Sequence, residues 1–148
     1  MTNDRPGAIR LGGPVRKASV TLRVSGPNLD PAEITKGLGC DPTYTHLNGD
    51  AIPSTSNVRK AGMWMLELEG GRLEDQLTQL AKLVRVDLAI WKEVVRGLDV
   101  DVFCGLYLET ENEGIEIEPT LLTWLGERGL SLGFDIYLDP DDDDEPEH

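Results

Sequence analysis

Strict alternation of apolar and polar residues is the feature that most constrains the fold of this chain. Residues 18–25 read Ala-Ser-Val-Thr-Leu-Arg-Val-Ser, so that apolar side chains recur at every second position. Because successive side chains of a β-strand point to opposite faces, such a strand buries one face and leaves the other in water. The sequence therefore predicts a sheet that is covered on one side. Further strands are predicted at residues 62–69, 100–109, 115–118 and 130–138.

Helical periodicity predicts the layer that covers this sheet. Between Leu73 and Leu88 the apolar residues form a single stripe at helical spacing. The pattern resumes through Trp91 and Val95, so the segment forms either one long helix or two helices with a bend near 86–87. Shorter helices are predicted at residues 31–38 and 119–128. The order β-α-β-α-β-β-α-β favours an α+β two-layer sandwich, with a mostly antiparallel sheet of about five strands and its helices on one face.

The 148 residues suffice for one domain, and their formal charge of −13 is unevenly distributed. Residues 139–147 hold seven acidic residues and no basic one, which predicts a disordered acidic tail over 139–148. Residues 1–17 hold four basic residues and one acidic residue, which predicts a flexible basic N-terminal arm. A single α+β domain is expected at residues 18–138. The tail is interpreted either as a lure for a basic partner or as a solubility tail.

Composition excludes several classes of function. Fourteen basic against 27 acidic residues disfavour direct binding of nucleic acid or of an anionic membrane, because both depend on Lys and Arg. No apolar run approaches the roughly 18 residues of a membrane span, and no signal-peptide core is recognisable. Two cysteines are too few for a disulfide scaffold, and no zinc-type spacing occurs. We therefore expect a soluble cytoplasmic protein without a cofactor or a metal.

The face of the predicted sheet opposite the helices is unusual for a surface in water. Its side chains combine methionine, aromatic rings and carboxylates, a mixture that is typical of surfaces that contact a protein partner. Alternatively, the 40–61 segment or the N-terminal arm lies across this face, or two copies of the chain stack through it. The candidate partner-binding residues are Met63, Met65, Glu67, Asp101, Phe103, Tyr107, Asp135 and Tyr137.

Signs of catalysis are weak, and no catalytic residue is predicted. Cys104 is in phase with the apolar residues of its strand, which indicates a buried thiol. Cys40 follows a helix C-terminus, where a thiolate is disfavoured. His46 is expected to be a loop histidine. Four acids assigned to the open face (Glu67, Asp101, Glu116 and Asp135) could converge as in a glycosidase or a cation site, but a charged strand face is favoured.

The segment 40–61 has no regular period and is the most informative irregular element. Long structureless segments in compact domains are often functional. The alternative to a partner-binding face is therefore a small-molecule or undetected enzymatic site between this loop and the sheet. Its candidate residues are Tyr44, His46, Asp50, Arg59 and Trp64.

Short motifs along the domain are similar to one known family. They are residues 25–34 (Ser-Gly-Pro-Asn-Leu-Asp-Pro-Ala-Glu-Ile), 38–43 (Leu-Gly-Cys-Asp-Pro-Thr), 49–50, 62–64 and 134–137. Together they make residues 18–138 resemble a bacterial family known as domain of unknown function 4279. The resemblance implies a small single-domain bacterial protein of this layout, and it carries over no catalytic residue because the family has no agreed activity.

Proteins of this kind are similar to acidic immunity and accessory proteins encoded beside toxin genes, which is an analogy of class. The expectation is a non-enzymatic acidic protein that masks a basic protein partner, in concrete form an immunity protein for a nuclease-type toxin. The alternatives are the small-molecule or enzymatic site and a homodimeric structural or accessory protein.

Overall fold

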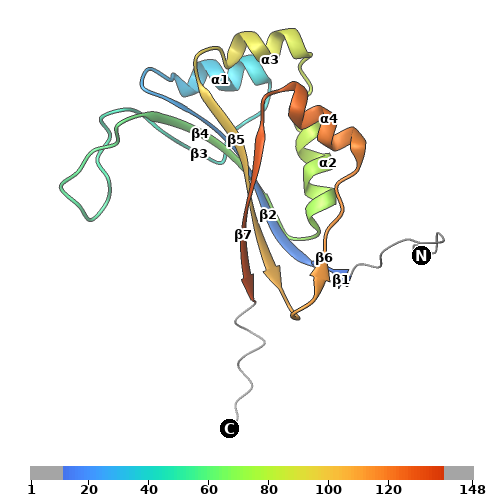
Figure 1. Ribbon diagram of the computed structural model, residues 1–148. Helices are drawn as coiled ribbons and strands as arrows, with labels where there is room; N and C mark the ends of the chain where they lie inside the picture. The colour runs from blue at the N-terminus through green and yellow to red at the C-terminus, as the bar shows by residue number, and fades with distance from the viewer. Residues whose placement is uncertain (1–11, 139–148) are drawn as a thin grey trace.

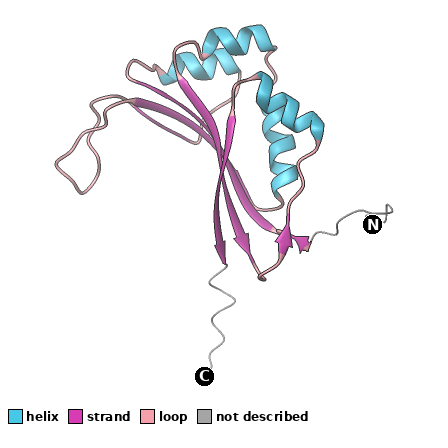
Figure 2. Cartoon of the chain, in the orientation of Figure 1, coloured by secondary structure: helices cyan, strands magenta, loops and turns pink. Residues whose placement is uncertain are grey.

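The computed structural model describes residues 12–138 and shows the expected α+β fold, an open five-stranded sheet with helices on one face (Figures 1 and 2). The strand order is β3-β4-β2-β5-β7. The pairs β3–β4, β4–β2 and β2–β5 are antiparallel, and β5–β7 is parallel. The strands of this sheet are β2 (Lys17–Gly26), β3 (Tyr44–His46), β4 (Gly62–Glu69), β5 (Asp99–Leu108) and β7 (Ser131–Leu138).

The helices begin and end where local signals require it. Asp30 accepts a hydrogen bond from the backbone N–H of Ala32 at 3.1 Å, and Gly39 ends the first helix with a left-handed φ of 74°. The long apolar stripe forms two helices, because Asp87 caps the second by accepting from the N–H of Ile90 at 3.0 Å. The helices are α1 (Pro31–Leu38), α2 (Leu73–Leu83), α3 (Leu88–Val94) and α4 (Pro119–Glu127).

The core lies between β4-β2-β5 and the helices. Val20, Leu22 and Val24 of the central strand are completely buried. The indole N–H of Trp64 donates to the Thr35 hydroxyl at 3.0 Å, and the buried side chain of Gln76 in α2 donates to the carbonyl of Ala18 at 2.8 Å. These bonds tie helices to strands and satisfy the indole N–H of Trp64 and the side-chain N–H group of Gln76. Oε1 of Gln76 is buried without a partner among residues 12–138. The core also contains Leu38, Leu66, Leu73, Leu77, Leu80, Val84, Trp91, Val102, Cys104 and Leu106.

Two predictions, one on the N-terminal arm and one on a short strand, are wrong. Residues 12–17 are packed rather than an arm: β1 (Gly13–Pro14) pairs in parallel with β6 (Glu113–Gly114), and Val15 is buried. The predicted strand at 115–118 is not formed, and its apolar residues pack against the core from a coil. The remainder of the predicted arm and the predicted tail lie outside the described residues.

The segment 40–61 extends the sheet instead of crossing it. Tyr44 and His46 pair with Met65 and Met63, so three residues of this segment form the edge strand β3. The following loop folds back on itself, with the backbone N–H of Arg59 donating to the Asp50 carbonyl at 2.7 Å, and it projects beyond the sheet edge (Figure 1). The prediction of an irregular segment is therefore wrong for residues 44–46, and within residues 12–138 the loop leaves the open face uncovered.

The far half of β7 is exposed on both faces. Phe134 and Ile136 lie opposite Cys104 and Leu106 of β5, on the helix side of the sheet. The alternation of apolar residues in the sequence therefore predicts both in the core, yet they are 37% and 62% exposed. The reason is that β5 and β7 run beyond α4 (Figure 1). Their assignment to the core is wrong because alternation gives the face of a residue and not the extent of the helix layer.

Within residues 12–138, none of the helices combines the length and the apolar character needed to cross a bilayer.

Truncation of Leu77 should destabilise the domain strongly, because its side chain is buried between α2 and the sheet. We expect Leu77→Ala to lower the free energy of unfolding by about 2–5 kcal/mol, as for other buried leucines. Leu122→Ala, at a half-exposed position of α4, is the matched control and should change it by about 0.5 kcal/mol or less. Urea denaturation of both variants measures the difference, and equal losses would contradict the described core.

Candidate functional site

The uncovered face of the sheet brings the predicted partner-binding residues together in cross-strand rows. Arg23 of β2 lies between Met65 of β4 and Asp101 of β5. The neighbouring row contains Thr21 between Glu67 and Phe103. Further along β5 and β7, Tyr107 lies opposite Tyr137, and Gly105 lies opposite Asp135. The eight residues singled out from the sequence thus share one face, opposite to the helices.

Arg23 and Asp101 form a fixed pair at the centre of this face. The guanidinium donates from Nε to Oδ1 at 2.8 Å and from Nη2 to Oδ2 at 2.7 Å. It also lies 5.0 Å from the centre of the Phe103 ring. The hydrogen bond to Asp101 raises the pKa of Arg23 above its ordinary value. Because the two side chains are about one third exposed, the pair forms a neutral, ordered polar centre on this face.

Two tyrosines form a second ordered group at the β5–β7 side. The rings of Tyr107 and Tyr137 stack with centres 5.3 Å apart and 11° between their planes. The hydroxyl of Tyr137 donates to Asp135 at 2.9 Å, and this bond raises the pKa of Tyr137. Stacked rings that hold a carboxylate in place supply apolar area at low cost in conformational entropy.

The open face is hollowed at two places. One hollow of about 260 Å³ lies beside the central ion pair and is lined by Ser25, Met63 and Asp99. The other, of about 310 Å³, is lined by Ser19, Glu67, Glu69 and Tyr107, among others. Carboxylates border both hollows, together with Arg23 in the first and Lys17 in the second, so both offer hydrogen-bond acceptors beside a cation.

The residues of the alternative site mostly converge on the same face. The rings of Tyr44 and His46 lie 5.5 Å apart edge to face, and Arg59 donates to the Tyr44 hydroxyl at 3.3 Å. Partial burial lowers the pKa of His46, with a further contribution from Arg59, while Asp50 acts in the opposite direction. Nδ1 of His46 is buried and lacks a hydrogen-bond partner among residues 12–138. The carboxylate of Asp50 accepts from the N–H of Leu47 at 2.7 Å and so closes the turn.

The assignment of Trp64 to that site is wrong. Its side chain is completely buried on the helix side, where it donates to Thr35. Its neighbour His46 faces the other way, since it pairs with Met63. The assignment of Glu116 to the open face is also wrong, because Glu116 lies in the coil between β6 and α4 and not on the sheet. The disfavoured alternative of four converging carboxylates is therefore not met.

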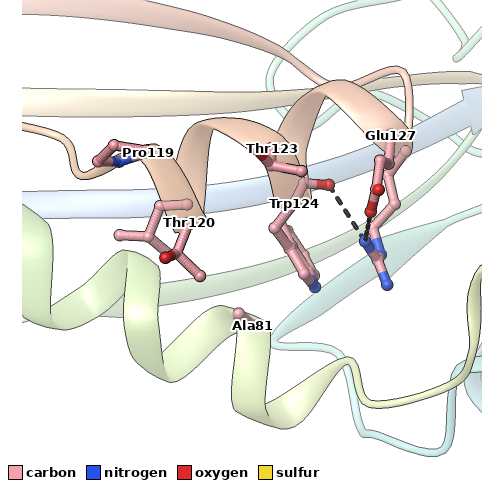
Figure 3. A pocket seen from close by; sticks show the side chains of 8 residues that line it. Ala81, Pro119, Thr120, Thr123, Trp124 and Glu127 are labelled. Atoms are coloured by element: carbon pink, nitrogen blue, oxygen red, sulfur yellow. Dashed lines mark hydrogen bonds and ion pairs between the residues drawn. The ribbon is translucent and has the colours of Figure 1, made fainter.

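A larger hollow, for which the sequence carries no signal, lies between α2 and α4 and measures about 540 Å³ (Figure 3). Trp124 and Thr120 point from α4 toward Ala81 of α2. Arg128 lies 4.5 Å from the centre of the Trp124 ring and donates to its carbonyl at 3.2 Å. Glu127 lies 3.8 Å from the same guanidinium. These contacts engage Nη1 of Arg128, whereas its Nε is buried without a hydrogen-bond partner among residues 12–138. We assign no ligand to this hollow.

The chemistry of the thiols is that of structural cysteines. Burial raises the pKa of Cys104 to about 12, and burial together with Asp41 raises the pKa of Cys40. In the part of the chain that the structure describes, no group of three or more His, Cys, Asp or Glu residues is arranged to hold a metal ion.

Alkylation by iodoacetamide at pH 8 tests the cysteine environments. Only the thiolate reacts, and a thiol with a pKa near 12 is about 10⁻⁴ ionised at this pH. Cys104 should therefore label at least about a thousandfold more slowly in the folded protein than in urea. Cys40, which is half-buried, should label faster than Cys104. Mass spectrometry of the labelled peptides measures both rates. Labelling of Cys104 at the unfolded rate would contradict its burial.

Comparison with known proteins gives one family and no individual relative. Neither the curated proteins nor the solved structures contain a match to this chain. A family model matches residues 16–139, which includes the sheet and the helices described above. The chain therefore belongs to the family described as Domain of unknown function (DUF4279).

Proposed function

We propose that this protein is a non-enzymatic binding protein whose open sheet face masks a basic surface of a protein partner. The observation that carries the proposal is a five-stranded sheet whose helices lie on one face (Figure 2). On the other face, ordered acidic and aromatic side chains lie side by side. Exposed faces of this composition are typical of interaction sites.

The charge on this face favours a basic partner. The strands of this face carry the cations Lys17 and Arg23, and the charge of Arg23 is balanced by Asp101. Arg59 of the adjoining loop adds a third cation beside Tyr44 at the β3 edge. Carboxylates near a partner accelerate its encounter and suppress partners of like charge. The whole chain, with a net charge of −13, adds a long-range field of the same sign. The acidic residues of the open strand face are Glu67, Glu69, Asp99, Asp101 and Asp135.

The apolar part of the face supports protein binding over binding of a small ion. Met63 and Met65 are half-buried at its centre, and the stacked Tyr107 and Tyr137 lie toward its β7 side. Tyr44 continues the surface onto β3. Aromatic and methionine side chains dominate the energetics of protein interfaces. The concrete form that we propose is an immunity protein that covers the basic cleft of a nuclease-type toxin.

One observation favours a second candidate, a small-molecule site at the β3 edge. His46 carries a buried Nδ1 without a partner in the described residues, and Tyr44 and Arg59 lie beside it. A ligand that displaces the atoms covering this nitrogen would satisfy it with a hydrogen-bond donor or acceptor, according to which ring nitrogen carries the proton. Binding there would depend on His46 and not on the carboxylates of β4 and β5.

Charge reversal on β4 tests the main proposal. The variant Glu67→Lys/Glu69→Lys reverses two exposed carboxylates that make no side-chain hydrogen bond or ion pair within residues 12–138. Asp101 is left intact, because its replacement would leave Arg23 without its ion-pair partner. We expect wild type to retain a basic protein from an extract of its host, and the variant to lose it. With the purified partner at low salt, the association rate constant should fall by about tenfold or more.

The control Glu111→Lys/Glu116→Lys changes the net charge equally but lies in the connection between β5 and α4. It should retain the same basic protein as wild type. Equal retention by all three proteins, or retention of no basic protein, would contradict masking through the open face.

A further inference from the structure

Strand β7 ends the sheet with an unprotected edge. It is eight residues long, it pairs with β5 on one side, and no described residue pairs with its other side. Its outer backbone N–H and C=O groups are therefore available to another strand. The opposite edge of the sheet differs, because β3 has three residues and is followed at once by the projecting loop.

The exposed apolar side chains of β7 favour pairing at this edge. On the helix side Phe134, Ile136 and Leu138 are 37%, 62% and 54% exposed. Natural edge strands are usually protected by lysine, proline or a bulge. Strand β7 contains no lysine and no proline, and it pairs with β5 without a bulge. Its one charged residue, Asp135, is held by the hydroxyl of Tyr137. An edge with these properties is suited to pairing with another strand.

We propose that β7 pairs in antiparallel register with β7 of a second copy, which joins the two sheets into one. Such an interface is two-fold symmetric, so each apolar side chain meets the apolar face of the same strand. A register shift by one residue would turn those side chains to the opposite face. The two residues at each paired position must therefore both be even-numbered or both be odd-numbered.

Like charges select between the registers that remain. Pairing centred on Asp135 would place two carboxylates directly opposite each other, which is destabilising. Pairing centred on Phe134 avoids this, because Asp135 then faces Gly133 of the second copy. It also places Ile136 opposite Leu132 and uses nearly the whole strand. We therefore assign the two-fold axis to Phe134.

Size and charge determine the strength of this dimer. A strand of eight residues spans roughly 26 Å, so the interface is smaller than that of an obligate dimer and the affinity is moderate. Each copy carries a charge of −13, and this repulsion is screened by salt. Self-association should therefore strengthen with ionic strength, whereas binding of a basic partner should weaken. Edge pairing leaves both open faces free and is independent of the masking function.

Light scattering after size exclusion, on the full chain at about 100 μM protein and at low and high salt, tests the proposal. We expect a mass that rises with salt toward twice 16.3 kDa. Ile136→Lys should abolish the increase, and the control Ile90→Lys, at an exposed position of α3, should preserve it. A monomer under all conditions overturns the proposal. So does a dimer that survives Ile136→Lys, because copies would then associate through another surface.

Disulfide trapping tests the register. In a Cys40→Ser background, Phe134→Cys should cross-link under mild oxidation, because paired positions across an antiparallel ladder lie within disulfide distance. Ile136→Cys should not, since the two copies of this residue would be about 13 Å apart along the strand. Cross-linking of Ile136→Cys and not of Phe134→Cys would overturn the assigned register, and cross-linking of neither variant would overturn edge pairing.

Discussion

Burial of one face of the central strand β2 under the helices determines the rest of the structure. Val20, Leu22 and Val24 are inaccessible to solvent, and the strands on both sides of β2 present their apolar residues in the same layer. The burial of apolar area is the main favourable term in folding. Since the helices lie on this one side, the opposite face follows as a second surface, free to carry function.

Alternation suffices to predict the two faces of the sheet, because the strand period of two is a local property. It assigns Met65 and Asp101 to the open side, and the structure places them there on either side of Arg23. The same alternation puts Trp64 on the helix side, in conflict with its assignment to a loop site. That assignment fails because proximity to the loop along the chain does not override the parity of a residue within its strand.

Features that depend on tertiary packing have no local signal in the sequence. Strand β3 is too short to show a period, so its contribution of Tyr44 and His46 to the open face could not be predicted. The exposure of Phe134 and Ile136 depends on where α4 ends relative to β7, which is a matter of packing. Both features concern the edges of the sheet, where neighbours rather than local pattern decide the environment of a residue.

Oxidation of the open-face methionines tests most directly whether this surface is free to bind a partner. Met63 and Met65 are half-buried in β4 with their side chains on the uncovered side. With hydrogen peroxide, the full native chain should form both sulfoxides within about tenfold of the rate in urea. Added partner should then protect both residues. Complete protection of Met63 and Met65 in the isolated protein would show that the chain covers its own sheet, and would contradict the account.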